Sequence, residues 1–280
     1  MSVPSALGNA TGSVLGTSVF PLSVADEPEV VLVSDLHLRP ETREDNAAFH
    51  ELIASVPDGG LLVVLGDLFD FWVGTKQLHD DSWRSVTECL RVASLRGVRI
   101  YTLWGNRDFQ LNAGFERAIG CRVVPGALLL QGGARPLLCL HGDELCQNDR
   151  AYQKAKRRLR SRPVRALLDI APFFVSRRLA EQARTVSKKT VAAALPSSLH
   201  PSVDAMAKIR ALGEVDTLFG HIHLAAAGAL PGDGPTLRYW VLPAFEADSR
   251  GHVRLVPGGE PRLFECGDQR SWPGPPPLGP

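Results

Sequence analysis

Several features that mark other protein classes are scarce in this chain of 280 residues. It has five cysteines, an odd number, and they form no C-x-x-C pair. Their scarcity excludes a disulfide framework and a cysteine-ligated zinc site, and it indicates a reducing compartment. No apolar run is long enough to cross a bilayer, and the first residues lack the positive segment and compact apolar core of a secretory signal.

An excess of charge of one sign is also lacking. The 31 Lys and Arg residues balance 30 Asp and Glu residues, for a formal net charge of +1. Because a strong positive excess is the usual footprint of nucleic-acid binding, the composition indicates no nucleic-acid partner. The chain is long enough to bury a full hydrophobic core. We expect a soluble, cytoplasmic enzyme that is a monomer.

Three changes of composition divide the chain. Residues 1–28 are small, polar and rich in Gly, Pro and Ser, which predicts a flexible N-terminal extension. Residues 29–268 alternate apolar strands with helical patterns, as in an α/β domain. Within them, residues 148–200 combine a dense basic stretch with apolar residues at helical spacing, and we interpret them as an inserted helical lid. The Pro/Gly-rich residues 269–280 predict a disordered tail.

Five apolar strands are each followed at once by residues that can bind a metal. The first reads V-V-L-V-S-D-L-H-L, and the later strands precede G-D, G-N-R-D, H-G-D and G-H-x-H. Ligands of open α/β sheets gather beyond the carboxyl ends of the strands, so these residues should form one cluster. The expected members are Asp35, His37, Asp67, Asn106, His141, His221 and His223.

This mixture of imidazole, carboxylate and amide groups suits Mn, Fe, Co or Zn better than Ca. Seven donors exceed the needs of one ion and fit two ions that share a carboxylate, for which Asp67 is the candidate. Paired metal ions promote phosphate-ester cleavage by making water nucleophilic and by neutralising phosphoryl charge. A single histidine is more often structural than a ligand, but five motifs at strand ends together indicate phosphoester hydrolysis.

The ordered motifs resemble those of the calcineurin-like metallophosphoesterases over residues 30–257. The resemblance implies a four-layer α/β fold, in which two packed mixed sheets are flanked by helices. It also implies two divalent metal ions, with Mn²⁺ expected. The first ion would take Asp35, His37, Asp67 and His223, and the second would take Asp67, Asn106, His141 and His221.

Within that superfamily, G-D-L-F-D-F-W-V-G, G-N-R-D-F and H-G-D-E-L-C-Q-N-D-R-A-Y-Q are similar to the UDP-2,3-diacylglucosamine hydrolases of lipid A biosynthesis. This similarity implies release of UMP and 2,3-diacylglucosamine 1-phosphate. The guanidinium of Arg107, where many relatives have histidine, can hold a phosphate with two donors. The implied catalytic residues are Asp67, Asn106, Arg107 and His141. The implied substrate contacts are Asn106, Arg107, Asp149, Ser187 and His221.

The predicted lid suits such a substrate. Two acyl chains need an apolar cleft and a diphosphate needs cations, and residues 148–200 are rich in Phe, Leu, Lys and Arg. Their basic face would rest on anionic headgroups, so we expect a peripheral protein at the cytoplasmic face of the inner membrane. The alternative is that these charges lie on solvated helix faces above leucines that face the core.

Two departures from the family pattern keep other functions open. The Asn and Lys usual after the lid serine are replaced by K-K-T-V-A-A-A-L-P, and T-H-R-P is replaced by I-H-L-A. One alternative is a divergent phosphodiesterase or pyrophosphatase for another nucleotide or phosphodiester, although the apolar lid argues against nucleic acid. The other is a non-catalytic scaffold, which would be expected to lose metal ligands that this chain retains.

Overall fold

The computed structural model describes residues 12–179, 182, 200–246, 249–276 and 278. Its first sheet has the strand order β14-β13-β12-β3-β4-β5-β6. Four of these strands run parallel: β3 (Val30–Val33), β4 (Leu61–Val64), β5 (Arg99–Leu103) and β6 (Arg122–Val124). Three antiparallel strands extend the sheet: β12 (His252–Leu255), β13 (Arg262–Glu265) and β14 (Asp268–Arg270). Every residue of β3 and β4 is buried, as their unbroken apolar runs predict.

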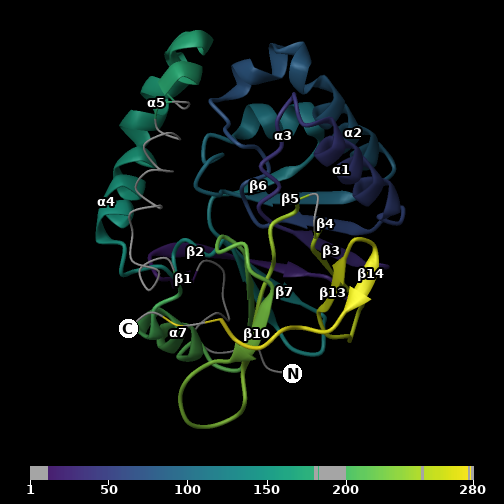
Figure 1. Ribbon diagram of the computed structural model, residues 1–280, viewed down its shortest axis with the longest axis vertical. Coiled ribbons are helices and arrows are strands. Elements are labelled where there is room, and N and C mark those ends of the chain that lie inside the picture. The colour runs from purple at the N-terminus through teal and green to yellow at the C-terminus, as the bar shows by residue number, and fades with distance from the viewer. Residues whose placement is uncertain (1–11, 180–181, 183–199, 247–248, 277, 279–280) are drawn as a thin grey trace.

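Helices cover the outer face of this sheet (Figure 1). They are α1 (Arg43–Ser55), α2 (Arg84–Leu95) and α3 (Ala113–Ile119), and the short 3₁₀ helices η1 (Thr75–His79) and η2 (Asp81–Trp83) precede α2. In α1, Phe49, Leu52 and Ile53 recur at helical spacing and are buried against the sheet. The spacing of these apolar residues therefore accounts for a helix at this place in the chain.

The second sheet has the order β1-β2-β7-β8-β9-β11-β10. Its strands are β1 (Ser13–Val14), β2 (Thr17–Ser23), β7 (Ala127–Gln131), β8 (Leu137–Leu140), β9 (Asp216–Phe219), β10 (Ala226–Ala229) and β11 (Arg238–Val241). Helix α7 (Val203–Arg210) packs on its outer face through Met206 and Ile209. Leu32, Leu128 and Leu218 belong to the apolar core shared by the two sheets. The predicted four-layer fold is thus confirmed.

The apolar run over residues 121–130 is divided between two strands in different sheets. Strand β6 ends at Val124 in the first sheet, and β7 begins at Ala127 in the second. Pro125 and Gly126 separate them, and a Cβ on Gly126 would collide with the carbonyl oxygen of Ser18. Strand β7 then turns back into β8, with which it forms an antiparallel pair.

The described segments near both chain ends contain more regular structure than their composition predicts. Residues 19–23 of β2 pair in parallel with β7, so the predicted flexible extension is wrong for the described residues from 12 onward. Strand β14 includes Gln269 and Arg270 of the predicted tail. Beyond it, the Trp272 ring lies 6.3 Å from that of Trp240, and the Pro273 carbonyl accepts a hydrogen bond from the backbone of Ala227. Open sheet edges provide partners for these segments, and composition alone does not reveal that.

The described part of the predicted lid is helical. It comprises α4 (Arg150–Leu159), α5 (Arg162–Ile170) and a helical segment over residues 173–179. Helices α4 and α5 stand along one side of the molecule, apart from α1–α3 (Figure 1). In the regions that the structure describes, there is no helix with the length and apolar character needed to traverse a bilayer.

Candidate metal centre

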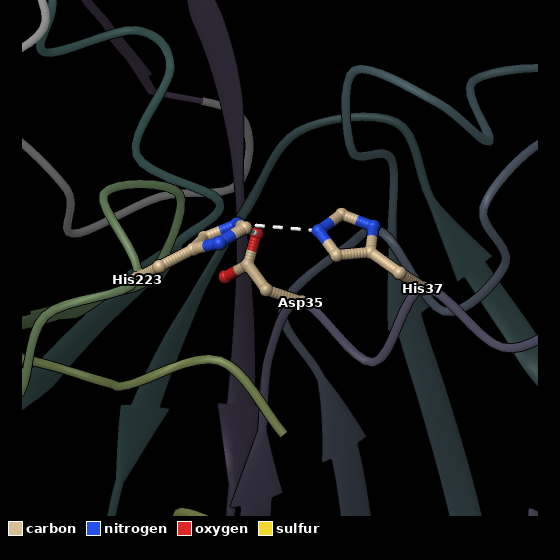
Figure 2. A group of neighbouring side chains, drawn as sticks. All are labelled: Asp35, His37 and His223. Atoms are coloured by element: carbon tan, nitrogen blue, oxygen red, sulfur yellow. Dashed lines mark hydrogen bonds and ion pairs between the residues drawn. The ribbon is translucent and has the colours of Figure 1, made fainter. Parts of the chain in front are cut away.

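The loops that follow β3, β4, β5, β8 and β9 bring the predicted ligands together. The ligand atoms of Asp35, His37 and His223 all lie within 4.8 Å of one another, and Figure 2 shows these side chains pointing toward one another. Asp35, Asp67 and His141 form a second group that meets the same limit. Because Asp35 belongs to both groups, the two groups are parts of one cluster.

Asp35 presents one carboxylate oxygen to this cluster. Its Oδ2 accepts hydrogen bonds from Ser34 Oγ at 2.6 Å and from the His221 amide at 2.8 Å. Its buried Oδ1 has no hydrogen-bond partner among the described residues and lies 3.3 Å from His223 Nε2. His223 Nε2 is in turn 3.2 Å from His37 Nε2. A buried carboxylate oxygen beside two imidazole nitrogens is a donor set that fits a divalent transition metal.

His141 and Asn106 form the other side of the cluster. His141 Nδ1–H donates to the Leu65 carbonyl at 2.9 Å, which leaves Nε2 as the acceptor. That nitrogen lies 2.9 Å from Asn106 Oδ1 and 3.9 Å from Asp67 Oδ2. Lone pairs this close repel each other unless a proton or a metal ion lies near both. His37 Nδ1 lies 3.7 Å from the same Asp67 oxygen, so Asp67 lies between the two halves of the cluster.

The electrostatics of the cluster favour a cation. Burial raises the pKa of Asp67 to about 7, and the carboxylates of Asp108 and Asp35 add to the shift. Burial lowers the pKa of His221 to about 3, assisted by His141. Crowded carboxylates are destabilised by one another, whereas a neutral imidazole has a lone pair to donate. A divalent cation would relieve the repulsion between the carboxylates and would accept the lone pair of the imidazole.

The backbone around the cluster is strained. Of the eight non-glycine residues with positive φ in the described chain, five are predicted ligands: Asp35, His37, Asp67, His221 and His223. Left-handed conformations of this kind cost about 1–3 kcal/mol each and concentrate at functional sites. The adjacent glycines have a steric role, because a Cβ on Gly105 would collide with Asp67 Oδ1 and one on Gly220 with Asp35 Oδ2.

Removal of divalent metal is expected to lower the thermal stability of the protein. A cation at about 100 times its Kd stabilises the folded state by about 2.7 kcal/mol, which corresponds to about 5–10 °C in Tm for a chain of this size. The measurement is a thermal unfolding scan after chelation and dialysis, with and without added Mn²⁺. An unchanged Tm on adding Mn²⁺, Co²⁺ or Zn²⁺ in turn would contradict a metal centre here.

Arg107 borders the cluster. Its amide donates to Asp67 Oδ1 at 2.9 Å, and its Nε lies 3.6 Å from Asp67 Oδ2. The side chain is 25% exposed, so its guanidinium is accessible from solvent beside the predicted ligands. Arg107 thus lies beside the predicted ligands, and its contact with phosphate stays a prediction. Of the other predicted substrate contacts, Asp149 accepts a hydrogen bond from the Tyr152 amide at the start of α4, and Ser187 lies outside the described residues.

Two aspartates with structural roles were missed by reasoning from the sequence. Asp108 is buried and accepts hydrogen bonds from the amides of Asp67, Leu68 and Gly105, so it supports two ligand loops at once. Asp143 is also buried and lies beneath the lid. Both belong to motifs already noted, G-N-R-D and H-G-D, and each stands two residues after a predicted ligand, which was the available signal.

Asp143 anchors helix α4. It accepts a hydrogen bond from Tyr152 Oη at 2.5 Å and lies 2.9 Å from Lys156 Nζ and 3.3 Å from Arg160 Nη2. The same Arg160 nitrogen donates to the Gly105 carbonyl at 2.8 Å. Lys156 and Arg160 are only 11% and 15% exposed. The prediction of a basic outer face is therefore wrong for these two residues, because their i, i+4 spacing turns both toward the core.

Comparisons with known proteins agree with this geometry. Residues 28–225 match the family model of the calcineurin-like phosphoesterases. The chain is 32% identical over 215 residues to the UDP-2,3-diacylglucosamine hydrolase of Stutzerimonas stutzeri, covering 76% of this chain and 89% of that protein. It is 31% identical over 232 residues to the enzyme of that name from Pseudomonas aeruginosa, covering 80% of this chain and 96% of the relative. The chain therefore belongs to the calcineurin-like phosphoesterases and, within them, to the group of the UDP-2,3-diacylglucosamine hydrolases.

Proposed function

We propose that this protein hydrolyses the pyrophosphate bond of UDP-2,3-diacylglucosamine, so that one water converts it to UMP and 2,3-diacylglucosamine 1-phosphate. The observation that carries the proposal is the cluster of carboxylates and imidazoles with the Arg107 guanidinium beside it. The similarity to hydrolases named for this substrate supports it.

The cluster would hold two divalent ions, with Mn²⁺ as the proposed metal. Asp67 would be shared, with Asp35, His37 and His223 on one side and Asn106, His141 and His221 on the other. When bound, such ions make water nucleophilic and neutralise charge on the phosphoryl oxygens. The protein contributes orientation: the Leu65 carbonyl fixes the tautomer of His141, and Ser34 fixes the rotation of the Asp35 carboxylate.

Arg107 would bind the phosphate under attack. Its Nη1 lies 2.9 Å from Asp70 Oδ1, so the side chain is already oriented before substrate arrives. A guanidinium offers donors in a fixed fork that matches phosphate oxygens. Asn106 and His221, which also belong to the cluster, are the further proposed contacts to the diphosphate. Asp149 and Ser187 remain proposed contacts to the sugar and its acyl groups.

The acyl chains and the membrane would meet the lid. Its described helices carry large apolar side chains that are 43–76% exposed, namely Leu159, Leu167, Ile170, Phe174 and Leu179. Exposed basic residues lie beside them at positions 150, 154, 157 and 158. Apolar groups flanked by cations favour insertion among anionic lipids. We therefore propose peripheral association with the cytoplasmic face of the inner membrane, with the protein acting as a monomer.

The enzymatic test is release of UMP by the purified protein with Mn²⁺ and UDP-2,3-diacylglucosamine, compared with Mg²⁺, Co²⁺ and Zn²⁺. Bis(p-nitrophenyl) phosphate, a generic diester, is assayed in parallel. The expected result is UMP release dependent on metal and much faster than diester hydrolysis. A protein that leaves the lipid nucleotide intact but hydrolyses the diester contradicts the substrate assignment and favours a divergent phosphodiesterase.

The variant Ile170→Glu is expected to weaken binding to vesicles of phosphatidylethanolamine and phosphatidylglycerol about tenfold or more. Burial of one large apolar side chain contributes about 1.5–3 kcal/mol, and a carboxylate would also be repelled by anionic lipid. Leu95→Glu is the matched control, because Leu95 is 72% exposed on α2, whereas Ile170 is 76% exposed. Co-sedimentation with vesicles measures both. An equal loss in the two variants would contradict binding through the lid.

A further inference from the structure

A second arginine lies beside Arg107. Arg39 follows the D-x-H motif by two residues, and its Nε lies 3.1 Å from Asp70 Oδ2. Its Nη2 donates to Asp70 Oδ1 at 3.3 Å, the oxygen that also accepts from Arg107 Nη1 at 2.9 Å. Two guanidinium groups from different loops thus meet at one carboxylate oxygen.

At Asp70, two guanidinium groups face one carboxylate, and the Asp67 carboxylate 3.6 Å from Arg107 Nε would be shared by the proposed metal ions. Asp70 is 1% exposed and brings one negative charge, whereas the two guanidinium groups bring two permanent positive charges. The side chains of Arg39 and Arg107 are 34% and 25% exposed, so both reach solvent. A buried carboxylate that orients two accessible arginines creates a local site for an anion.

Backbone hydrogen bonds hold this arrangement in register with the cluster. The amides of His37 and Leu38 donate to the carbonyls of Asp67 and Leu68, at 2.9 and 3.0 Å. The Asp70 amide donates back to the Leu38 carbonyl at 3.1 Å. The loop after β3 and the loop after β4 are therefore joined as far as Asp70. This pairing fixes the backbone directly before Arg39 relative to His37 and Asp67.

We propose that Arg39 is a second phosphate-binding residue, which acts with Arg107 across Asp70 to select a diphosphate over a single phosphodiester. The proposal rests on the proposed function, since it assigns Arg107 and the cluster to the phosphate under attack. Arg107 contacts both Asp67 and Asp70, whereas Arg39 contacts Asp70. Arg39 therefore binds the phosphate next to the one under attack. Asp70 is a positioning residue, because it acts through the two guanidinium groups that it orients.

The test compares Arg39→Ala with wild type on UDP-2,3-diacylglucosamine and on bis(p-nitrophenyl) phosphate. Loss of a charged hydrogen bond to the second phosphate is expected to lower kcat/KM for the diphosphate about 10- to 100-fold. The value for the diester is expected to fall by no more than about threefold, because that substrate has no second phosphate. Arg39→Lys, which keeps the charge but not the fork, is expected to recover part of the loss.

Arg91→Ala is the matched control, because Arg91 is an exposed arginine that pairs with Glu88 on α2. Thermal unfolding of each variant separates misfolding from loss of binding. Equal losses on both substrates, or no loss on either, would overturn the role of Arg39. If wild type cleaves UDP-N-acetylglucosamine or ADP-ribose but not the lipid nucleotide, the proposed substrate is wrong. The effect of Arg39→Ala on kcat/KM for that diphosphate, compared with its effect on the diester, then still tests the role of Arg39. If wild type cleaves no diphosphate at all, both the proposed function and the role of Arg39 are overturned.

Discussion

Asp67→Asn is expected to lower kcat for phosphoester hydrolysis by at least about a hundredfold, the scale for losing one main source of electrostatic stabilisation. Asp67 lies between the two halves of the cluster, 3.7 Å from His37 Nδ1 and 3.9 Å from His141 Nε2. An amide of the same shape keeps an acceptor for the Arg107 amide but loses the charge that two cations would share. Metal analysis should find fewer ions bound per chain than in wild type.

The stability of the same variant separates chemistry from folding. Burial and the carboxylates of Asp108 and Asp35 raise the pKa of Asp67 to about 7, so the ionised group is unfavourable without metal. Metal-free Asp67→Asn is therefore expected to unfold at the same temperature as the metal-free wild type or higher. Asp58→Asn, at a carboxylate whose side chain is 73% exposed, is the control. Full activity in Asp67→Asn would contradict the metal centre.

Asp143→Ala is expected to destabilise the protein by about 3 kcal/mol, the low end of the range for a broken buried ion pair, because Glu144 is left to neutralise both Lys156 and Arg160. Lys156, Arg160 and Tyr152 all contact the Asp143 carboxylate. Since these contacts hold α4, the variant should also be cleaved faster by trypsin within residues 150–179. Urea unfolding and timed proteolysis measure the two effects.

The stability that Asp143→Ala loses relative to wild type should depend on pH in a defined direction. Burial alone would raise the pKa of Asp143, but Arg160 and Lys156 outweigh it and hold the pKa well below its usual range. A carboxylate with a depressed pKa in the folded state stabilises that state above its unfolded pKa of about 4, and the contribution is lost as pH falls below it. The gap in stability between wild type and Asp143→Ala should therefore shrink below about pH 4.

The control for Asp143→Ala is Asp149→Ala, six residues along the chain. Asp149 caps α4 by accepting a hydrogen bond from the Tyr152 amide at 2.9 Å, and the loss of such a cap costs only about 1 kcal/mol. If the two variants lose similar stability, or if trypsin cleaves the lid of Asp143→Ala at the wild-type rate, the ion pairs of Asp143 with Lys156 and Arg160 do not hold α4 in place.

The metal centre could be predicted from the sequence because each ligand follows its strand within a few residues. Val30–Val33 and Leu61–Val64 are apolar without interruption, so their burial and direction follow from local pattern. The carboxyl ends of such strands meet at one edge, and Asp35 and Asp67 are then neighbours in space. The pattern of the sequence by itself therefore determined the ligand cluster and the class of chemistry, and the resemblance of its motifs to a known family supplied the two-sheet fold.

Only the tertiary structure decided which partners meet across the chain. Local spacing predicted that Lys156 and Arg160 share a helix face, but not that this face meets Asp143. Nothing near Arg39 in the sequence indicates Asp70, which lies 31 residues away. Strand β2 likewise depends on pairing with β7, about a hundred residues further along the chain. The physical reason is that local pattern encodes which side of an element is apolar or charged, whereas the groups opposite that side are set by how the layers pack.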